Sequence, residues 1–146
     1  MLLIDTYVGS SAIEGTGVFA GEPIMAGQHV WTLNPMFDRL ISHEQYRASP
    51  KPLQDFIDRY AYFDAGLNAF LLDGDHSRFL NHSEWPAIEF RADGDGYATR
   101  NIAAGEELTC DYRHFMSEVT ILPSRVPSPA VIANGHFNGH GPEITA

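Results

Sequence analysis

The first third of the chain consists of short apolar runs separated by frequent glycines. The β-branched and aromatic residues that mark these runs between residues 2 and 33 include Ile4, Tyr7, Val8, Val18, Phe19, Val30 and Trp31, and five glycines interrupt them. β-branched and aromatic residues in runs this short predict paired strands that form small curved sheets.

The pattern changes to a helical period between residues 42 and 60. Ser42 and Gln45 have the spacing of a capping box, and Pro50 stands where a first helical turn would begin. The apolar positions that fall on one helical face are Leu53, Phe56, Ile57 and Tyr60. We therefore expect one short helical insert in two parts.

Strand patterns return after residue 60 and continue to residue 112. Turn sequences at 64–66 and 73–75 divide the first part, and Asp93-Gly94-Asp95-Gly96 joins two expected strands, 88–91 and 97–102. Gly105 makes a further turn, so Tyr112 is expected at the end of a strand or just beyond it. We expect a domain over residues 1–116 and an irregular tail over 117–146, mobile in its last part.

The length and charge of the chain limit its class. At 146 residues it suits one domain with a single core. The 19 acidic and 9 basic residues give a formal net charge of −10, and no Lys/Arg cluster is visible. Such a charge repels nucleic-acid phosphate and attracts cationic partners such as a lysine-rich peptide, although many acidic proteins have no such partner.

The single cysteine and the N-terminus indicate the compartment. Cys110 alone excludes an intrachain disulfide and a zinc site made only of cysteines. Residues 1–5 lack the basic region of a signal peptide, so we interpret them as a first strand. No apolar run approaches the roughly 20 residues of a membrane span. We expect a soluble cytoplasmic protein without membrane contact.

Two polar segments, one early and one central, carry candidate chemistry. Gly15-Thr16-Gly17 would let the backbone approach a ligand closely, but the same residues also fit a tight hairpin bend. Asn81-His82-Ser83 offers amide and imidazole groups, either for a ligand or for a buried turn that satisfies backbone groups. A metal site of His82 with His76, Asp73 and Asp75 is a further alternative, although its spacing matches neither zinc nor calcium patterns.

Three motifs in order resemble those of SET-domain protein lysine methyltransferases. They are GTGVFA at 15–20, RFLNHS at 78–83 and GEELTCDY at 105–112. The resemblance covers about residues 5–115 and is greatest to the short, stand-alone bacterial and viral members. It implies a mainly β fold, the SET-domain β-clip of small curved sheets with a short helical insert. In this fold a C-terminal pseudoknot brings the second and third motifs together.

The resemblance implies transfer of a methyl group from S-adenosyl-L-methionine to a lysine of a protein or peptide, without a metal. We expect this substrate to be basic. Tyr112 would be the catalytic residue, and His82 would support the adenine through its backbone. The cofactor-binding candidates are Gly15, Thr16, Gly17, Arg78, Phe79, Asn81, His82, Tyr112 and Phe115. Phe115 would cover the adenine or close the lysine channel.

An aromatic channel would guide the lysine, because aromatic rings attract an ammonium group. The candidates are Tyr60, Tyr62, Phe90 and Tyr97, although each ring could equally fill the core of a small β-rich domain. Cys110 stands two residues before Tyr112, where the family commonly has Phe or Tyr. In the family that position influences the number of methyl groups added, and a thiol there leaves room.

The chain departs from the family pattern in three places. Residues 84–87 read Glu-Trp-Pro-Ala where Cys-x-Pro-Asn is frequent, and Leu33 replaces an early channel tyrosine. A cysteine-rich zinc segment is absent, so Phe115 with Ile121 and Leu122 would have to close the pocket. The alternative hypotheses are a degenerate SET fold that binds a basic peptide or cofactor without turnover and, last, a metal-binding protein that uses the seven histidines.

Overall fold

The structure, a computed structural model, describes residues 1–115. The expected tail at 117–146, with Ile121 and Leu122, lies outside the described residues. The strands are β1 (Thr6–Ser10), β2 (Thr16–Ala20), β3 (His29–Trp31), β4 (Arg39–Ile41), β5 (Ala61–Asp64), β6 (Ala69–Leu72), β7 (Asn81–His82), β8 (Ile88–Phe90), β9 (Gly96–Ala98) and β10 (Glu107–Cys110). The helices are α1 (His43–Ala48) and α2 (Lys51–Tyr60), with 3₁₀ turns η1 (His76–Phe79) and η2 (Tyr112–His114).

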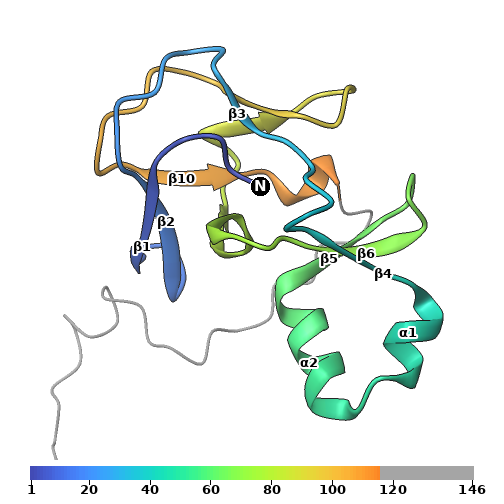
Figure 1. Cartoon of the computed structure of the whole chain (residues 1–146). Coiled ribbons are helices and arrows are strands. Elements are labelled where there is room, and N and C mark those ends of the chain that lie inside the picture. The colour runs from blue at the N-terminus through green and yellow to red at the C-terminus, as the bar shows by residue number, and fades with distance from the viewer. Residues whose placement is uncertain (116–146) are drawn as a thin grey trace, which may run out of the picture.

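The larger sheet has the strand order β1-β2-β10-β8-β9-β3, and β7 also pairs with β10. The hairpin β1–β2 is antiparallel, as the apolar pattern predicts. β10, the last strand in sequence, lies in the interior of the sheet, antiparallel to β2 and parallel to β7 and β8 (Figure 1). Strands that are far apart along the chain therefore meet at β10.

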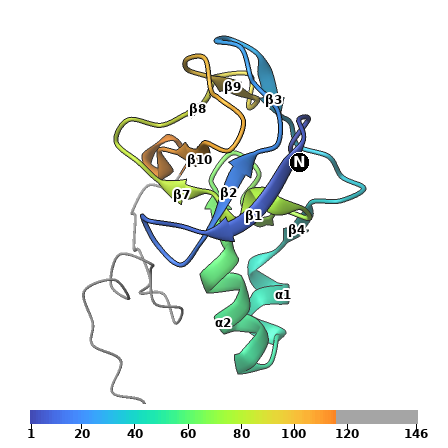
Figure 2. The same ribbon diagram turned by 90° about the vertical axis from the view of Figure 1, so that its left-hand side faces the viewer.

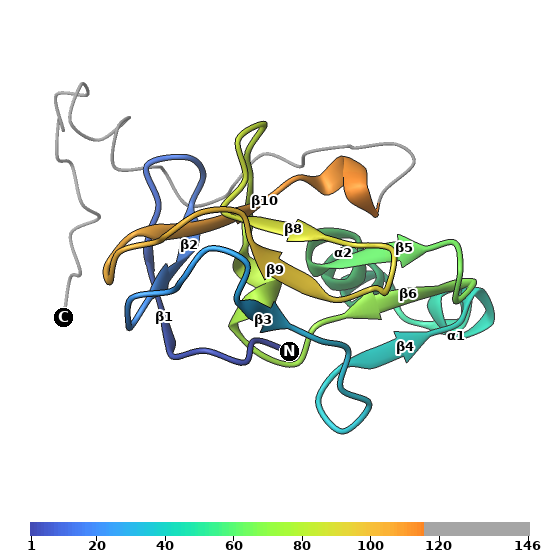
Figure 3. The ribbon, with the colours of Figure 1, turned by 90° about the horizontal axis from the view of Figure 1, so that it is seen from above.

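The smaller sheet has the order β4-β6-β5 with antiparallel neighbours. It lies with α1 and α2 at the end of the molecule that is remote from the hairpin β1–β2 (Figure 3), and Figure 2 shows the two helices side by side below the strands. The hairpin β8–β9, predicted from the turn at 93–96, extends from the larger sheet toward β5 and β6 (Figure 3). The space between these two hairpins contains the principal cavity described below.

The helical insert begins as its sequence predicts. The backbone N–H of Gln45 donates to Ser42 Oγ at 3.1 Å, and the N–H of Ser42 donates to Gln45 Oε1 at 2.9 Å, which forms the expected capping box. Pro50 is the N-cap of α2 and not a residue of its first turn, which instead contains Pro52. Proline is tolerated there because the first turn leaves its N–H groups without helical partners.

The expected apolar face of α2 is only partly covered. Ile57 is buried at 1% exposure, whereas Leu53 and Phe56 remain 46% and 38% exposed. The side chain of Ile57 therefore anchors the helix, and most of the hydrophobic stabilisation of this contact comes from it.

The core is formed largely by side chains from strands that are far apart in the sequence but neighbours in the larger sheet. Val18 of β2, Ile88 of β8 and Leu108 of β10 are fully buried and belong to one hydrophobic cluster. Their burial fixes β10 between its neighbours, because a slip by one residue would turn Leu108 away from the core.

The interpretation of residues 1–5 as a strand is wrong, since the first strand begins at Thr6. Leu2 forms a single bridge to Trp31, and its N–H donates to the carboxylate of Asp75 at 2.6 Å. The Met1 ammonium donates to Asp38 at 3.1 Å. The Leu3 N–H also donates to the Val30 carbonyl at 2.8 Å, and the Thr32 N–H donates to the Met1 carbonyl at 3.1 Å, so this segment joins β3 through one bridge and does not continue as a strand. Within residues 1–115, no helix has the length and hydropathy needed to cross a membrane.

Candidate active site

β10 places the three sequence motifs side by side. Leu108 is opposite Val18 of the first motif, Thr109 is opposite Asn81, and Cys110 is opposite His82 of the second motif. Both partner segments come well before β10 in the sequence, and even the hydrogen-bonded pair Asn81 and Glu107 is 26 positions apart. The parallel pairing with β7 brings these motifs together as the expected pseudoknot requires.

The side chain of Asn81 holds the glycine loop. Its Nδ2 donates to the carbonyl oxygens of Glu14 and Thr16 at 3.1 and 3.3 Å, and to Glu107 Oε1 at 2.9 Å. Asn81 is buried, so these bonds also satisfy an amide that would be costly to leave unpaired. The amide thus fixes the backbone of residues 14–16 beside β10.

Glu107 and Ser11 contribute to this arrangement, and sequence reasoning missed both. Glu107 Oε1 accepts a second hydrogen bond, from Ser11 Oγ at 2.7 Å. A Cβ atom on Gly17 would lie 2.3 Å from the same oxygen, so only glycine fits there without displacing the carboxylate. A carboxylate at the start of an otherwise apolar strand, Glu107 before Leu108, was the signal available in the sequence.

Tyr112 is held at both its hydroxyl and its backbone. The hydroxyl donates to the carbonyl oxygen of Leu80 at 2.6 Å, and the backbone N–H donates to His82 Nδ1 at 3.3 Å. Burial raises the pKa of the Tyr112 phenol well above its ordinary value. At neutral pH the site therefore contains an uncharged hydroxyl in a fixed direction.

The imidazole of His82 lies against Tyr112, with ring centroids 5.3 Å apart. Because Nδ1 accepts the Tyr112 N–H, the neutral ring carries its proton on Nε2. Asp111 Oδ1 lies 3.7 Å from Nδ1, but the Asp111 carboxylate is bound by the guanidinium of Arg113 at 2.7 Å, which holds its pKa well below the usual range. The side chain of His82 thus supports the tyrosine, a contact that sequence reasoning did not predict.

Phe115 joins the catalytic candidate to two of the channel candidates. Its ring centroid lies 4.4 Å from that of Tyr62, 5.4 Å from Phe90 and 6.0 Å from Tyr112. Burial is the main cause that raises the pKa of Tyr62, so this hydroxyl is also neutral. These contacts place Phe115 beside the channel candidates.

The remaining aromatic candidates lie elsewhere. The ring of Tyr60 packs edge-on against Phe79 at 5.7 Å. Tyr97 stacks on His29 at 5.0 Å, lies under the guanidinium of Arg91 and donates its hydroxyl to Asp93. The structure therefore does not bring Tyr97 against Tyr112.

Arg78 and Phe79 border a smaller hollow of about 400 Å³. The guanidinium carbon of Arg78 lies 5.9 Å from the Phe79 ring centroid, and its Nε donates to the carbonyl of Asp75 at 3.2 Å. This hollow also contains side chains of residues 2–6, before and at the start of β1. It is separate from the cavity that Tyr62 and Phe115 line.

Cys110 is buried in β10, where burial raises the pKa of its thiol well above the ordinary value. A thiol that stays protonated is a weak nucleophile, so Cys110 serves as a small apolar group beside Tyr112. Within residues 1–115, no group of three His, Cys, Asp or Glu side chains is placed to hold a metal ion. His76 instead contacts Thr6 Oγ1 at 3.0 Å, and Asp75 binds backbone N–H groups.

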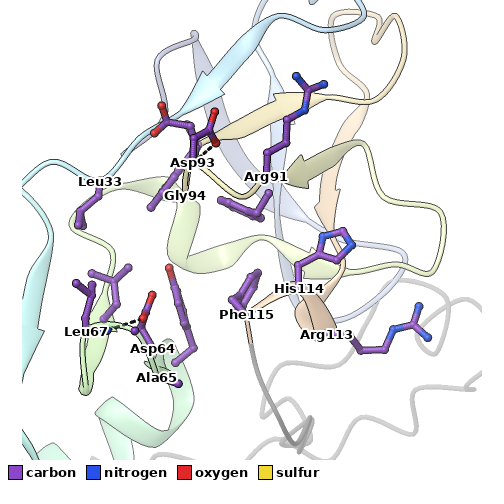
Figure 4. Close-up of a pocket in the computed structure, with 16 residues that line it drawn as sticks. Leu33, Asp64, Ala65, Leu67, Arg91, Asp93, Gly94, Arg113, His114 and Phe115 are labelled. Carbon is purple, nitrogen blue, oxygen red and sulfur yellow. Dashed lines mark hydrogen bonds between the residues drawn. The ribbon is translucent and has the colours of Figure 1, made fainter.

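A cavity of about 650 Å³ opens between the β5–β6 turn, the β8–β9 turn and η2 (Figure 4). Its lining includes the channel candidates Tyr62 and Phe90 and also Phe115. Leu33 lies in the lining as well, so this departure from the family pattern falls on the cavity wall. Sequence reasoning missed the lining residues Trp31, Asp64, Asp93 and Asp95, because both turn sequences were assigned a role only in chain reversal.

The sequence model of the SET domain matches residues 15–113. The chain belongs to the SET domain family. The expected SET fold, mainly β with small sheets and a short helical insert, is thereby confirmed. Comparison with curated protein sequences gives no match.

Two solved structures resemble this SET domain. A Plasmodium falciparum protein assigned as a histone methyltransferase is 25% identical, with a TM-score of 0.54 over 76% of this chain and 95% of that one. Polycomb repressive complex 2 of Chaetomium thermophilum is 27% identical, with a TM-score of 0.58 over 75% of this chain and 15% of the other chain. The SET domain described here thus corresponds to a small part of that second protein.

Proposed function

We propose that this SET domain transfers a methyl group from S-adenosyl-L-methionine to the side-chain amine of a lysine in a protein or peptide. The observation that carries the proposal is the neutral hydroxyl of Tyr112, fixed by the Leu80 carbonyl and the His82 imidazole. Tyr112 contacts His82 of the second motif and Phe115, and the ring of Phe115 lines the aromatic cavity. Membership of the SET domain family and similarity to a histone methyltransferase support the same activity.

The residues around the glycine loop fit the cofactor. The loop backbone is held in place by Asn81, whose side chain donates to the carbonyl oxygens of Glu14 and Thr16. In the proposal, the residues that hold the cofactor are Gly15, Thr16, Gly17, Arg78, Phe79, Asn81, His82, Tyr112 and Phe115. When bound, S-adenosyl-L-methionine supplies a methyl group on a positively charged sulfur.

The protein's contribution to this reaction is alignment and exclusion of water. Methyl transfer is an in-line displacement in which the amine nitrogen, deprotonated beforehand, forms a bond to the methyl carbon as the carbon–sulfur bond breaks. Tyr112 can hold the reacting groups in line without adding a charge, because its hydroxyl stays protonated. Tyr62, Phe90 and Phe115 would exclude water around the incoming lysine.

The lysine would approach through the cavity of Figure 4. Tyr62 and Phe90 line it directly, whereas Tyr60 lies against Phe79 and Tyr97 lies on the outer face of β9. Cys110 is the last residue of β10, two positions before Tyr112, and its thiol occupies less volume than the Phe or Tyr that is common there. In this proposal the rings of Tyr62 and Phe90 contact the side chain of the acceptor lysine. Tyr60 and Tyr97 do not line the cavity, so they would contact other parts of the substrate.

Labelled cofactor tests the function directly. Incubation with a panel of lysine-rich proteins should transfer label, and Tyr112→Phe should reduce the rate by about 100-fold or more. Tyr46→Phe is the matched control, because it also removes one tyrosine hydroxyl but belongs to α1, where that hydroxyl donates to Asp58 outside the cavity, and it should keep at least half the rate. Full activity of Tyr112→Phe would exclude the proposed role of Tyr112.

Calorimetric measurement of cofactor binding separates the enzyme from a non-catalytic binding module. The wild-type protein should bind both S-adenosyl-L-methionine and its demethylated product, and Tyr112→Phe should retain most of that affinity. If neither compound binds at millimolar concentration, the chain is a binding module with a SET fold and not an enzyme.

A further inference from the structure

The rim of the large cavity carries three carboxylates. Asp64 stands in the β5–β6 turn, and Asp93 and Asp95 stand in the β8–β9 turn. Figure 4 shows Asp93 on one side of the cavity and Asp64 on the opposite side. The Asp95 N–H donates to Asp93 and holds the pKa of that carboxyl below its usual range, so it stays ionised.

The two arginines of the lining are already paired. The guanidinium of Arg91 lies 2.6 Å from Glu89, and that of Arg113 lies 2.7 Å from Asp111. Neither Glu89 nor Asp111 lines the cavity. Each cation is therefore paired with a carboxylate outside the cavity, although Arg91 also contributes to the lowered pKa of Asp93. His29 lies 3.1 Å from Asp95. Of the three rim carboxylates, Asp64 has no arginine or histidine paired with it among these contacts.

The walls between these carboxylates are aromatic. Trp31 and Phe90 meet edge to face at 5.2 Å, and Phe115 closes the inner end against Phe90 and Tyr62. Behind the wall, the buried carboxylate of Asp73 accepts the Trp31 Nε1–H at 3.3 Å. Aromatic faces and carboxylates both favour a cationic occupant over a neutral or anionic one.

We infer that this cavity binds a basic peptide segment and that it takes a second cationic side chain, one that flanks the acceptor lysine. This inference rests on the proposed function, because the acceptor lysine is the one that would be methylated. A volume of about 650 Å³ lies in the range of sites that bury ligands larger than one side chain. Asp64, on the opposite side of the cavity from Asp93, is the specificity-determining residue for that second cation.

Peptide binding without cofactor tests the inference. The probes are a fluorescent Gly/Ser-spaced peptide with one central lysine flanked by arginines, and a matched peptide with glutamines in place of the arginines. The wild-type protein should bind the arginine peptide about tenfold more tightly at low salt, and the preference should shrink as salt is raised.

Isosteric variants assign the preference to the rim. Asp64→Asn should reduce the preference for the arginine peptide about threefold, and Asp64→Asn with Asp95→Asn about tenfold. Asp55→Asn is the matched control, since it removes the same charge from the exposed surface of α2 and should change the preference less than twofold. Urea unfolding of each variant verifies that it is folded.

The outcomes separate this inference from the proposed function. Equal binding of the two peptides by the wild-type protein, or an unchanged preference in the double variant, overturns the inference and leaves methyl transfer intact. A charge-dependent preference without transfer of label to any lysine peptide supports the cavity's role and overturns the enzymatic proposal.

Discussion

The carboxylate of Glu107 determines which residue the chain can have at position 17. It accepts hydrogen bonds from Ser11 Oγ at 2.7 Å and Asn81 Nδ2 at 2.9 Å, and it occupies the space that a side chain on Gly17 would need. The glycine of the first motif is thus required by a close approach within the protein, in addition to any approach of the cofactor.

Gly17→Ala tests this arrangement. The new Cβ would lie 2.3 Å from Glu107 Oε1, so the carboxylate must move and leave Ser11 and Asn81 without their acceptor. We expect a loss of about 1–3 kcal/mol in the free energy of unfolding and weaker cofactor binding by calorimetry.

The double variant Gly17→Ala with Glu107→Ala supplies the control. Because it removes the clash, its destabilisation should be smaller than the sum of the two single effects by about 1 kcal/mol. Strictly additive effects in urea unfolding would show that the contact between these two positions is unimportant.

The sequence predicted which residues form the candidate site better than it predicted their contacts. Asn81, His82 and Tyr112 were expected to lie together, and the pairing of β10 with β7 places them so. The contacts of Asn81 with residues 14 and 16 and of Tyr112 with Leu80 were not predicted. Their partners are 32 to 67 positions away, and no local pattern encodes such a distance.

At the scale of elements, α2 depends on one buried side chain. Ile57→Ala removes a side chain that is 1% exposed and leaves a cavity beneath the helix, so we expect the free energy of unfolding to fall by about 2–4 kcal/mol. Leu53→Ala, on the same helix and 46% exposed, should cost less than about 1 kcal/mol. Urea unfolding compares the two variants, and equal effects would contradict the anchoring role of Ile57.

Elements with strong local signals were predicted correctly, and elements formed by distant partners were not. The capping box of α1 and the β8–β9 hairpin follow from residues within a few positions of one another. β7 has two residues and therefore no apolar period, so only its pairing with β10 makes it a strand. Residues 1–5 have strand-like composition, but they join β3 only through the bridge at Leu2, where Asp75 binds the Leu2 N–H and Asp38 binds the Met1 ammonium.

At the scale of the whole molecule, buried carboxylates connect the N-terminal segment to both sheets. Asp38 accepts from the Met1 ammonium and from the N–H groups of Asn34 and Gly74. Asp73 lies close by, with its Oδ1 at 3.9 Å from the Met1 nitrogen and hydrogen-bonded to Trp31. The stability of the fold should therefore depend on the protonation of this cluster.

Asp73 should destabilise the fold at neutral pH. Burial, together with the nearby carboxylates of Asp38 and Asp75, raises the pKa of Asp73 from 3.8 to about 6. The folded protein binds this proton more tightly than the unfolded chain, so the contribution of Asp73 to stability falls as pH rises from about 4 to 6. Above that window the destabilisation by the ionised Asp73 carboxylate is constant. The pKa difference corresponds to a loss of about 3 kcal/mol at most in the free energy of unfolding.

Asp73→Asn keeps an acceptor for the Trp31 Nε1–H and removes the titration. The variant should therefore be more stable than the wild type at pH 7.5, and this advantage should disappear near pH 4, where the wild-type carboxyl is protonated. Urea unfolding midpoints of the two proteins at both pH values measure the difference in stability between variant and wild type. Acid also destabilises the fold through other carboxylates whose pKa is lowered, such as Asp111, but this effect is common to both proteins and cancels in the difference. An advantage that is constant with pH would mean that Asp73 does not titrate in this window, and that its effect on stability comes from packing.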